Sequence, residues 1–504
     1  MISFYYLLLA IILIILLFII CIFLTKHIPV KKQTWCQRII WSILAILIFG
    51  SSVLWNHQNT IFPKINATIG NDPSFWNQTW GAKNNGILIQ FLNNVDVQIM
   101  PKPKNYSKTT INKIVKKYQK EAKKINRKRK NDISKQTIIF NLSEAFANPQ
   151  RVPGIRLNTN PIPNIDKIKK NTTSGLMMSS GYGGGTANME YMTLTGLATC
   201  NFAPTMSSPY TQLVPRQKYI PTFNQEFPYS VGIHPYTGEF YNRISNYKKF
   251  RFNKFAYLNN KKAPITNLHK IDKNTYQSDK TAYINLLNQL HKYNKPQFIN
   301  LITMQNHYPY NNLYKSHQFK ATSTNKSNTS SIDTFATGLH YTDVAVTNTI
   351  KLLNKINIPI TLVFYGDHLP AVGYTNKMTK DGIKLHQTDY FIYSNKAAKK
   401  IGARILKKNA KYVSPSNFIA MTLEQTNSKV TPYQALLTQI YRNLPAFSID
   451  STGRSTNAQF IDNNGHRTSL NKKQKILWRD YKLIQYDLTN GHYYSCNHTF
   501  YNKN

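Results

Sequence analysis

The stretch "ITLVFYGDH", residues 360–368, combines a strand pattern with two residues that can carry chemistry. Residues 360–366 are mostly apolar, and Asp367 and His368 follow them directly. A short apolar run of this length, bounded by polar turns, is typical of a strand buried on both faces. Ligands in open α/β sheets gather where such strands end. The stretch therefore predicts a buried strand with a functional site at its carboxyl end.

Three other apolar runs have the same pattern: "TIIFNL" (137–142), "FINLITM" (298–304) and "YFIYS" (390–394). Helical periodicity lies between them, at residues 281–293 and 338–356. Alternation of strands and helices is typical of an α/β domain with a largely parallel sheet. We therefore expect this fold over residues 134–490.

The ends of three predicted strands offer an acid or an imidazole. Glu144 follows residues 137–142, His307 follows residues 298–304, and Asp367 and His368 follow residues 360–366. Isolated side chains of this kind are usually helix caps or surface groups, but three together favour a site. A mixed set of oxygen and nitrogen ligands suits Mn²⁺ or Zn²⁺ better than Ca²⁺.

A glycine-rich loop precedes a threonine in "SSGYGGGTANMEYMTLTG", residues 179–196. Its glycines let the backbone turn sharply and expose amides to a phosphate. Thr186 would open a helix whose amino end faces the anion. A hydroxyl bound to a metal becomes a nucleophile at neutral pH. The loop lacks the GK[ST] ending of a Walker motif, and no strong strand signal precedes it, which argues against a Rossmann fingerprint.

The amino-terminal region predicts membrane anchoring. Residues 2–24 are apolar and long enough to span a bilayer, and residues 39–55 are a shorter second candidate. Four basic residues lie between or beside these segments, which places that loop in the cytoplasm by the positive-inside rule. We therefore expect two transmembrane helices, with residues 56–504 outside the cell. The alternative is a single anchor, with residues 39–55 packed into the soluble part.

The chain of 504 residues has 64 Lys and Arg against 21 Asp and Glu, a net charge of +43. This charge favours a polyanionic partner: nucleic acid, anionic lipid headgroups or an anionic wall polymer. Zinc-finger spacing and RNP-like signatures are not found in the sequence, so nucleic acid is not expected. Cys200 and Cys496 could form a disulfide or remain free thiols.

Residues 101–131 hold thirteen Lys or Arg and one Glu. Apolar residues recur through this segment at helical spacing: Ile111, Ile114, Val115, Tyr118, Ala122 and Ile125. The pattern predicts a basic amphipathic helix. Its apolar stripe could dock on the next domain, or the helix could lie on anionic lipid headgroups.

The chain resembles the lipoteichoic acid synthase family of membrane phosphoglycerol transferases, within the alkaline phosphatase and sulfatase superfamily. The resemblance rests on "NLSEAF", "SSGYGGGTANMEYMTLTG", "GIHPYTGEFYNR", "TMQNHYPY" and "FYGDHLPA", in the family's order, and covers roughly residues 80 to 490. It implies an alkaline phosphatase/sulfatase-like α/β sandwich with a mostly parallel central sheet. The family's Gram-positive members serve cell wall biogenesis.

The resemblance also implies roles for residues of the metal site. Glu144, Thr186, Asp367 and His368 match the family's metal ligands, with Mn²⁺ the usual ion and Mg²⁺ or Zn²⁺ as alternatives. Thr186 matches the nucleophile, which takes glycerophosphate from phosphatidylglycerol as a covalent phosphothreonine.

Further matches concern substrate binding. His307 matches a histidine that contacts the bound phosphoglycerol, and Arg243 matches an arginine that binds its phosphate. His234 opens the segment that contains Arg243, and Tyr241 stands where the family has Trp. A guanidinium fork suits a phosphate, and an imidazole can donate a proton to a leaving alkoxide.

Two further departures bear on the substrates. The well-studied synthases have about five membrane helices, whereas this sequence predicts two. After the Asp-His pair the family usually has an aromatic-Gly-Ile-Ser run whose serine contributes to the glycerol pocket, whereas residues 369–372 are Leu-Pro-Ala-Val. These differences put the acceptor, and to a lesser degree the donor, in doubt.

The sequence thus predicts a phosphoglycerol transferase that acts on a glycolipid, teichoic acid or surface glycan. The alternatives are a phosphodiesterase or phosphatase of the same superfamily and a non-catalytic surface protein. A formylglycine sulfatase is disfavoured because Thr186 is not the Cys or Ser that such enzymes convert. The expected division is a membrane anchor (1–55), a juxtamembrane segment with the basic helix (56–133), an extracellular catalytic domain (134–490) and a tail (491–504).

Overall fold

A computed structural model describes most of the chain. The described residues are 15–16, 19–20, 22–23, 33–55, 60–71, 78–95, 97–324, 329–372, 374, 382–449, 458–496 and 498–501. The chain divides into two compact units, one of residues 1–72 and 82–96, and one of residues 73–81 and 97–504. The second unit holds the predicted α/β domain together with residues 97–133.

Among residues 33–95, the described helices are α2 (Trp35–Ser51), continued by a 3₁₀ turn (Ser52–Leu54), α3 (Phe62–Thr68), α4 (Gln78–Asn85) and α5 (Ile87–Val95). Within the described residues, the segment Trp35–Leu54 is the one helix long and apolar enough to cross a membrane, with 20 residues and a mean hydropathy of 1.7. It begins four residues before the predicted span because Thr34 and Gln37 form a capping box. The predicted span at residues 2–24 lies mostly outside the described residues.

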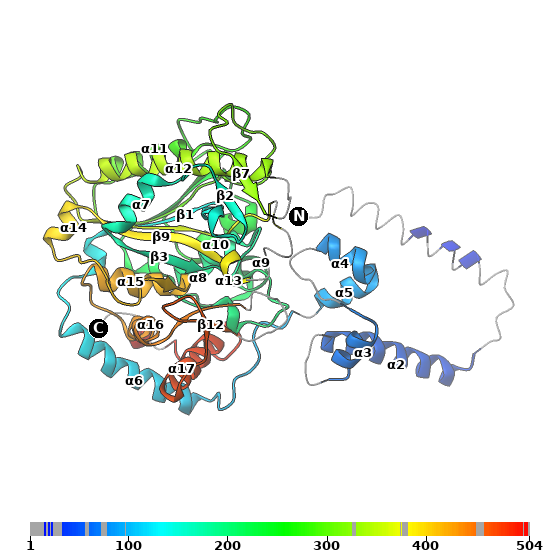
Figure 1. The fold of residues 1–504 in the computed structure, drawn as a ribbon. Coiled ribbons are helices and arrows are strands. Elements are labelled where there is room, and N and C mark those ends of the chain that lie inside the picture. Colours follow the sequence, from blue (N-terminus) through cyan, green and yellow to red (C-terminus); the bar gives the residue numbers. More distant parts are fainter. Residues whose placement is uncertain are drawn as a thin grey trace. The chain divides into compact units, whose positions relative to one another are not determined.

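The second unit is built on an eight-stranded sheet within the described residues, in the order β10-β3-β9-β8-β1-β6-β4-β5 (Figure 1). The strands are β1 (Thr137–Ser143), β3 (Thr173–Met178), β4 (Ser230–Thr237), β5 (Lys254–Leu258), β6 (Phe298–Ile302), β8 (Ile360–Gly366), β9 (Gln387–Ser394) and β10 (Tyr412–Val413). All four predicted strands are present, and β1, β6 and β8 are neighbours. The predicted mostly parallel α/β sheet is confirmed.

Strand β9 is the exception, because it pairs antiparallel with both β8 and β3. The described part of the connection from β8 to β9 contains only the single-turn helix α13 (Gly382–Leu385). If β9 ran parallel to β8, the chain would have to cross back to the amino end of β8, usually through a longer helix. The chain instead turns back at the carboxyl edge of β8.

Strand β3 corrects one interpretation of the sequence, because it ends directly before the glycine-rich loop at residue 179. The strand signal is weak since Gly175 interrupts it. A Cβ at Gly175 would lie 2.1 Å from the carbonyl oxygen of Ala410, so the neighbouring backbone leaves room only for glycine.

Helices cover both faces of the sheet (Figure 1). Alternate residues of β1 enter the two cores: Phe140 lies in one and Ile139 in the other. Helices α7 (Pro163–Lys170), α11 (Asp279–Lys292) and α12 (Ser330–Leu353) pack in the core that contains Ile139. The other core contains α8 (Thr186–Thr195), α15 (Phe418–Gln425), α16 (Pro432–Asn443) and α17 (Lys472–Thr489). The two predicted helices at 281–293 and 338–356 correspond to α11 and α12.

The predicted basic helix is α6 (Lys108–Asn126), and all six residues of its apolar stripe are buried. It packs against α16 and α17, where Lys117 Nζ lies 2.7 Å from Asp480 Oδ2. The docking alternative is therefore confirmed. Since this stripe is used inside the protein, it offers no apolar face to lipid.

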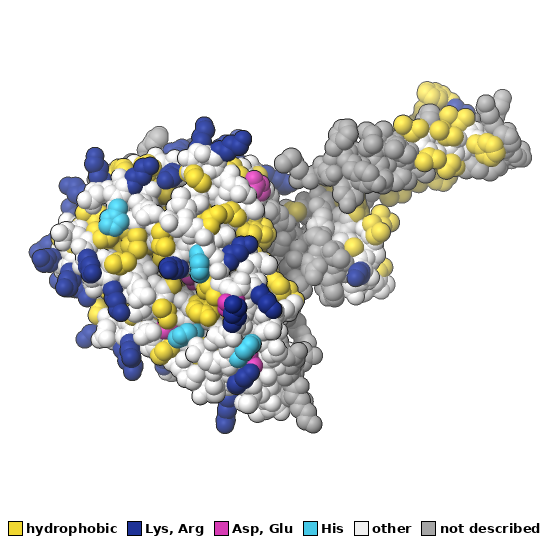
Figure 2. Space-filling view, turned by 90° about the horizontal axis from the view of Figure 1, so that it is seen from above, with side chains coloured by type: hydrophobic (Ala, Val, Ile, Leu, Met, Phe, Trp, Pro, Cys, Tyr) yellow, Lys and Arg dark blue, Asp and Glu magenta, His cyan; other side chains and the backbone are white. Residues whose placement is uncertain are grey.

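Short elements complete the second unit. They are the pair β2 (Ile155–Leu157) and β7 (Ala321–Ser323), the small sheet β11 (Ala446–Ser448), β12 (Gln459–Ile461) and β13 (Arg467–Thr468), and helices α9 (Pro209–Gln212), α10 (Arg243–Lys249), α14 (Lys396–Lys400) and α18 (His498–Tyr501). Cys200 and Cys496 are free thiols. Figure 2 shows Lys and Arg scattered over one face of the unit rather than gathered in a single patch.

Candidate active site

Glu144 and Asp367 are brought together by the register of two central strands. Ser143 of β1 pairs with Gly366 of β8, so the residues that follow are neighbours at the carboxyl edge. The turn after Glu144 is tight: Ala145 adopts a φ of 49°, and its amide donates to Asp367 Oδ1 at 2.7 Å. A Cβ at Gly366 would lie 1.8 Å from the carbonyl oxygen of Phe146, so glycine is required there.

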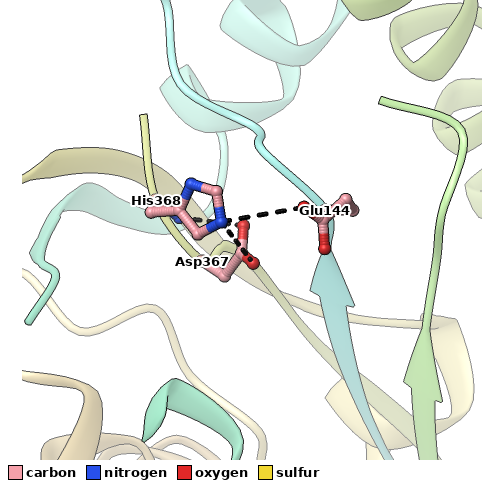
Figure 3. Close-up of side chains that lie close together, drawn as sticks. All are labelled: Glu144, Asp367 and His368. Carbon is pink, nitrogen blue, oxygen red and sulfur yellow. Dashed lines mark hydrogen bonds and ion pairs between the residues drawn. The ribbon is translucent and has the colours of Figure 1, made fainter. Parts of the chain in front are cut away.

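Glu144, Asp367 and His368 converge in one cluster (Figure 3). His368 Nε2 lies 3.7 Å from Glu144 Oε1 and 3.4 Å from Asp367 Oδ2. Ligand atoms of the three side chains all lie within 4.8 Å of one another, and all three residues are buried. The structure therefore brings together three of the four predicted metal ligands from two strand ends.

The cluster fits a divalent cation. Asp367 Oδ2 is buried without a hydrogen-bond partner among the described residues. Burial and the nearby charge of Asp367 raise the pKa of Glu144 well above its ordinary value. Two buried carboxylates this close repel each other, and a bound cation would offset both the repulsion and the loss of solvation. The donor set of two carboxylates and one imidazole agrees with the expected ion class.

Thr186 joins the cluster at the amino end of α8. Its Oγ1 lies 3.3 Å from Glu144 Oε2. Gly185, the residue before the helix, has a φ of 95° and offers no side chain to cap it, so the first amides of α8 lack a side-chain cap from that position. The loop is held beside the ligand segment because the Gly183 amide donates to the Leu369 carbonyl at 2.8 Å. The arrangement places a hydroxyl and helix amides where an anion would bind.

Arg243 is held by two further buried residues. Its Nε donates to Glu190 Oε2 at 3.0 Å, and its Nη1 lies 3.4 Å from His234 Nε2. The guanidinium also lies 5.3 Å from the centre of the Tyr241 ring. The structure therefore brings three predicted substrate-binding residues together around one guanidinium.

Glu190 is a site residue that the sequence analysis missed. It is completely buried on α8 and accepts hydrogen bonds from Tyr247 and Asn300 as well as from Arg243. Burial lowers the pKa of Arg243, but Glu190 together with Tyr247 and Tyr210 outweighs burial and holds that pKa above its ordinary value. The only available signal was the spacing of four residues from Thr186, which places both on one face of a helix.

His234 and His307, the two histidines matched to substrate binding, lie in different environments. Burial and the charge of Arg243 lower the pKa of His234 well below its ordinary value, which favours the neutral imidazole. Its Nδ1 lies 3.2 Å from the carbonyl oxygen of Ile302.

His307 lies on the loop after β6, where its ring packs on Tyr276 with a centroid distance of 4.9 Å. Tyr276 in turn packs on Tyr236, which contacts the ring of Phe240. Rings thus connect His307 to the segment that carries Arg243.

Comparison with known proteins gives a consistent result. The Sulfatase family profile matches residues 136–428. The solved structure of the Streptococcus pyogenes phosphoglycerol transferase GacH, in complex with sn-glycerol-1-phosphate, is 36% identical in sequence. It superimposes with a TM-score of 0.71 over 80% of this chain and 99% of that one.

Two more distant relatives extend the comparison. A Rhizobium meliloti (strain 1021) protein, named as a candidate cyclic β-1,2-glucan modification protein, is 26% identical over 92% of this chain and 70% of its own length. An alkaline phosphatase superfamily protein from Vibrio parahaemolyticus is 14% identical, with a TM-score of 0.50 over 78% of this chain and 97% of that one, and supports the fold alone.

Proposed function

The chain belongs to the sulfatase family, and from that premise we propose that it is a metal-dependent phosphoglycerol transferase. In this proposal the donor is phosphatidylglycerol, and the acceptor is a glycolipid, teichoic acid or surface glycan. The observation that carries it is the position of the Thr186 hydroxyl, 3.3 Å from Glu144 Oε2 in a cluster suited to a metal. The likeness to the phosphoglycerol transferase GacH supports this choice within the family.

Each residue has a proposed role in the first half of the reaction. Glu144, Asp367, His368 and Thr186 would hold the ion, with Mn²⁺ as the expected species. When bound, such an ion lowers the pKa of a hydroxyl and offsets charge on a phosphate. Arg243 binds a phosphate oxygen, since a guanidinium carries several donors in a fixed fork. His234, which is neutral, and Tyr241 hold that guanidinium in place.

Bond changes follow from this arrangement. The Thr186 oxygen attacks phosphorus, and the bond from phosphorus to the diacylglycerol oxygen breaks. Diacylglycerol leaves with a proton that His307 can supply as an imidazolium. The glycerophosphate is then held on Thr186 as a phosphodiester. An acceptor hydroxyl attacks the same phosphorus and loses its proton to the His307 imidazole. The bond from phosphorus to the Thr186 oxygen breaks, and that oxygen leaves in the deprotonated form with which the cycle began.

We propose that α2 and residues 2–24 anchor the protein in the membrane and that the catalytic unit lies outside the cell. The apolar segment Trp35–Leu54 and the basic residues beside it support this placement. Protease added to intact cells should then degrade the catalytic unit.

The decisive experiment supplies phosphatidylglycerol labelled in its headgroup, together with Mn²⁺ and a cell-surface polymer fraction. Label transferred to polymer by the wild-type protein, and not by Thr186→Ala, is the expected result. Label released as free glycerophosphate would favour the hydrolase alternative. Undiminished transfer by Thr186→Ala would exclude the assigned nucleophile.

A further inference from the structure

A groove of the catalytic unit gathers positive charge away from the proposed active site. It is a groove of about 750 Å³ between the end of α6, residues 404–409 and the end of α16. Its walls carry Lys124, Lys128, Arg404, Lys407 and Lys408. Helices α6 and α16 lie side by side in Figure 1 and pack against each other. Two separate segments therefore bring these five cations to one concavity, and Arg442 of α16 adds a sixth.

The groove lies at the opposite end of the sheet from Thr186. Two segments that line the groove lie just before the amino ends of strands: α6 precedes β1, and residues 404–409 precede β10. β10 is parallel to β3, which has the same direction as β8 and β1. The proposed catalytic residues follow the carboxyl ends of β1 and β8. A seven-residue strand such as β1 is about 23 Å long, so the two places are well separated.

Most of these cations are not compensated by nearby acids. Lys128, Arg404, Lys407 and Lys408 form no ion pair with a carboxylate among the described residues. Two acids also line the groove: Glu121 pairs with Lys124 at 3.6 Å, and Glu424 is engaged by Arg442 with nitrogen–oxygen distances of 3.0–3.3 Å. An excess of cations in a concave site raises the local concentration of anions.

Arg129, which lies inside the groove, independently supports anion binding there. Its side chain is 5% exposed, and its Nη2 has no hydrogen-bond partner within the described structure. Among the described residues it pairs with one carboxylate, that of Glu424, which lies 3.5 Å from Nη2 and is also held by Arg442. Burial lowers the pKa of Arg129 to about 10, with Glu424 opposing and Arg442 adding to the shift. A buried guanidinium with a spare donor is a ready partner for a phosphate oxygen.

We propose that this groove binds a polymer that carries repeated glycerol phosphate groups. The assignment rests on the proposed function, since such a polyanion is the product expected of that reaction. A narrow chain can enter the groove and reach Arg129, whereas a bilayer surface meets only the exposed lysines at its rim. Arginine forks favour phosphodiesters over carboxylates. Binding here would retain the product on the enzyme while Thr186 remains free to react.

The test compares two sets of three lysines in the full-length protein in detergent. The groove variant is Lys128→Gln with Lys407→Gln and Lys408→Gln. The control variant is Lys292→Gln with Lys351→Gln and Lys355→Gln, exposed lysines on α11, on α12 and just after α12, on the other face. Both remove the same net charge. Each is combined with Thr186→Ala, so that the probe is bound without being consumed.

The probe is a synthetic oligomer of glycerol phosphate, measured at an ionic strength of about 0.15 M. We expect the groove variant to bind it about tenfold or more weakly and with a smaller salt dependence, because phosphate contacts are lost. The control variant should change the affinity less than about threefold. An equal loss in both variants, or no loss in either, would overturn the proposal.

Two other ligands identify what the groove recognises. Polyglutamate of matched charge should bind more weakly than the phosphate oligomer; equal or tighter binding would overturn the phosphate assignment. For the vesicle measurement the full-length protein is first moved from detergent into phosphatidylcholine nanodiscs, since detergent would dissolve the vesicles. Phosphatidylglycerol vesicles should then bind both variants alike; a loss of vesicle binding confined to the groove variant, with oligomer binding intact, would identify a membrane contact instead and overturn the proposal.

The outcome is separable from that of the proposed function. Groove-dependent oligomer binding without any transfer of labelled glycerophosphate by the wild-type protein would contradict the transferase assignment alone. Transfer by the wild-type protein, with oligomer binding that does not depend on the groove, would contradict the groove assignment alone.

Discussion

Arg243 and Glu190 form a buried ion pair, with Arg243 Nε 3.0 Å from Glu190 Oε2 and both side chains at most 1% exposed. Glu190 lies on α8 one turn after Thr186. One helix therefore positions both the proposed nucleophile and the partner of the proposed phosphate-binding guanidinium. The distance between hydroxyl and guanidinium depends on this helix rather than on a loop.

Glu190→Gln tests that relationship, because it keeps the shape and removes the charge. Removing one partner of a buried ion pair costs about 3–5 kcal/mol of stability. We expect destabilisation in this range by urea unfolding, and a rise in KM for the donor that exceeds the loss in kcat. The loss should not be recovered by Glu190→Asp, whose shorter side chain cannot reach Arg243 from the same backbone position.

Glu121→Gln is the matched control, since Glu121 is partly exposed and pairs at 3.6 Å with the exposed Lys124. It should change stability by at most about 1 kcal/mol and leave KM unchanged. If Glu190→Gln changed stability and KM as little as this control does, the positioning role of Glu190 would be refuted.

The proposed covalent step predicts a trapped intermediate on Thr186. Incubation with phosphatidylglycerol and Mn²⁺ but no acceptor should add one glycerophosphate to the peptide that contains Thr186, detected by mass spectrometry. Thr186→Ala should lower the transfer rate by at least about a thousandfold, as loss of a nucleophile does elsewhere. Its unfolding midpoint should stay near that of the wild type. A labelled peptide from another part of the chain would contradict the assignment.

If Glu144, Asp367 and His368 bind a metal ion, the ion should stabilise the folded protein, and this can be measured without an activity assay. Mn²⁺ at about 100 times its Kd should stabilise the wild-type protein by about 2.7 kcal/mol. Asp367→Asn should abolish most of this gain, because Asp367 Oδ2 has no hydrogen-bond partner within the described residues and would be a ligand of the ion. Asp343→Asn, at a buried carboxylate beside the start of α7, should retain it. Equal gains in both variants would exclude the Asp367 cluster as the binding site.

Asp389 predicts a pH-dependent contribution to stability. Burial raises the pKa of its carboxyl, but Arg151 and Lys169, each 2.5 Å away, outweigh burial and hold the pKa well below its ordinary value. A group whose folded pKa is depressed stabilises the protein above its unfolded pKa of about 3.9, and this contribution is lost as pH falls through the folded pKa. Asp389→Asn should therefore destabilise by about 3 kcal/mol at pH 7.

That difference should shrink as the pH is lowered from about 5 toward 2 in urea titrations of both proteins. A difference that stays constant over this range would show that the carboxyl charge does not contribute. Asp389 Oδ2 also accepts from the amide of Asn148, so the same variant should loosen the segment after Glu144.

The central strands and the metal cluster could be predicted from sequence for one physical reason. β1, β6 and β8 are buried on both faces, so each is a continuous apolar run, and the residues that follow share one edge of the sheet. β3 was missed because Gly175 weakens its pattern, although the close approach of Ala410 requires glycine. The candidate metal ligands could be identified because they follow the strand ends and match the motifs of the family resemblance.

Glu190 could not be predicted in the same way. Nearly every residue of α8 is buried, so the helix has no polar face against which an unusual carboxylate would stand out. Its partner Arg243 is 53 positions away in sequence. Only the folded chain places them together, since β4 and the turn at Tyr241 direct Arg243 toward α8.

The docking of α6 determines where a soluble fragment of this protein should begin. A fragment that starts at residue 134, the predicted edge of the catalytic domain, would strip α6 from α16 and α17 and leave their apolar surface in water. Residues before α6 are also tied in: the Ile99 carbonyl accepts from Ala203 at 3.0 Å, and Tyr106 donates to Asp487 at 2.5 Å. Expression beginning at residue 97 keeps these contacts and should yield a monodisperse product, whereas the shorter fragment should aggregate.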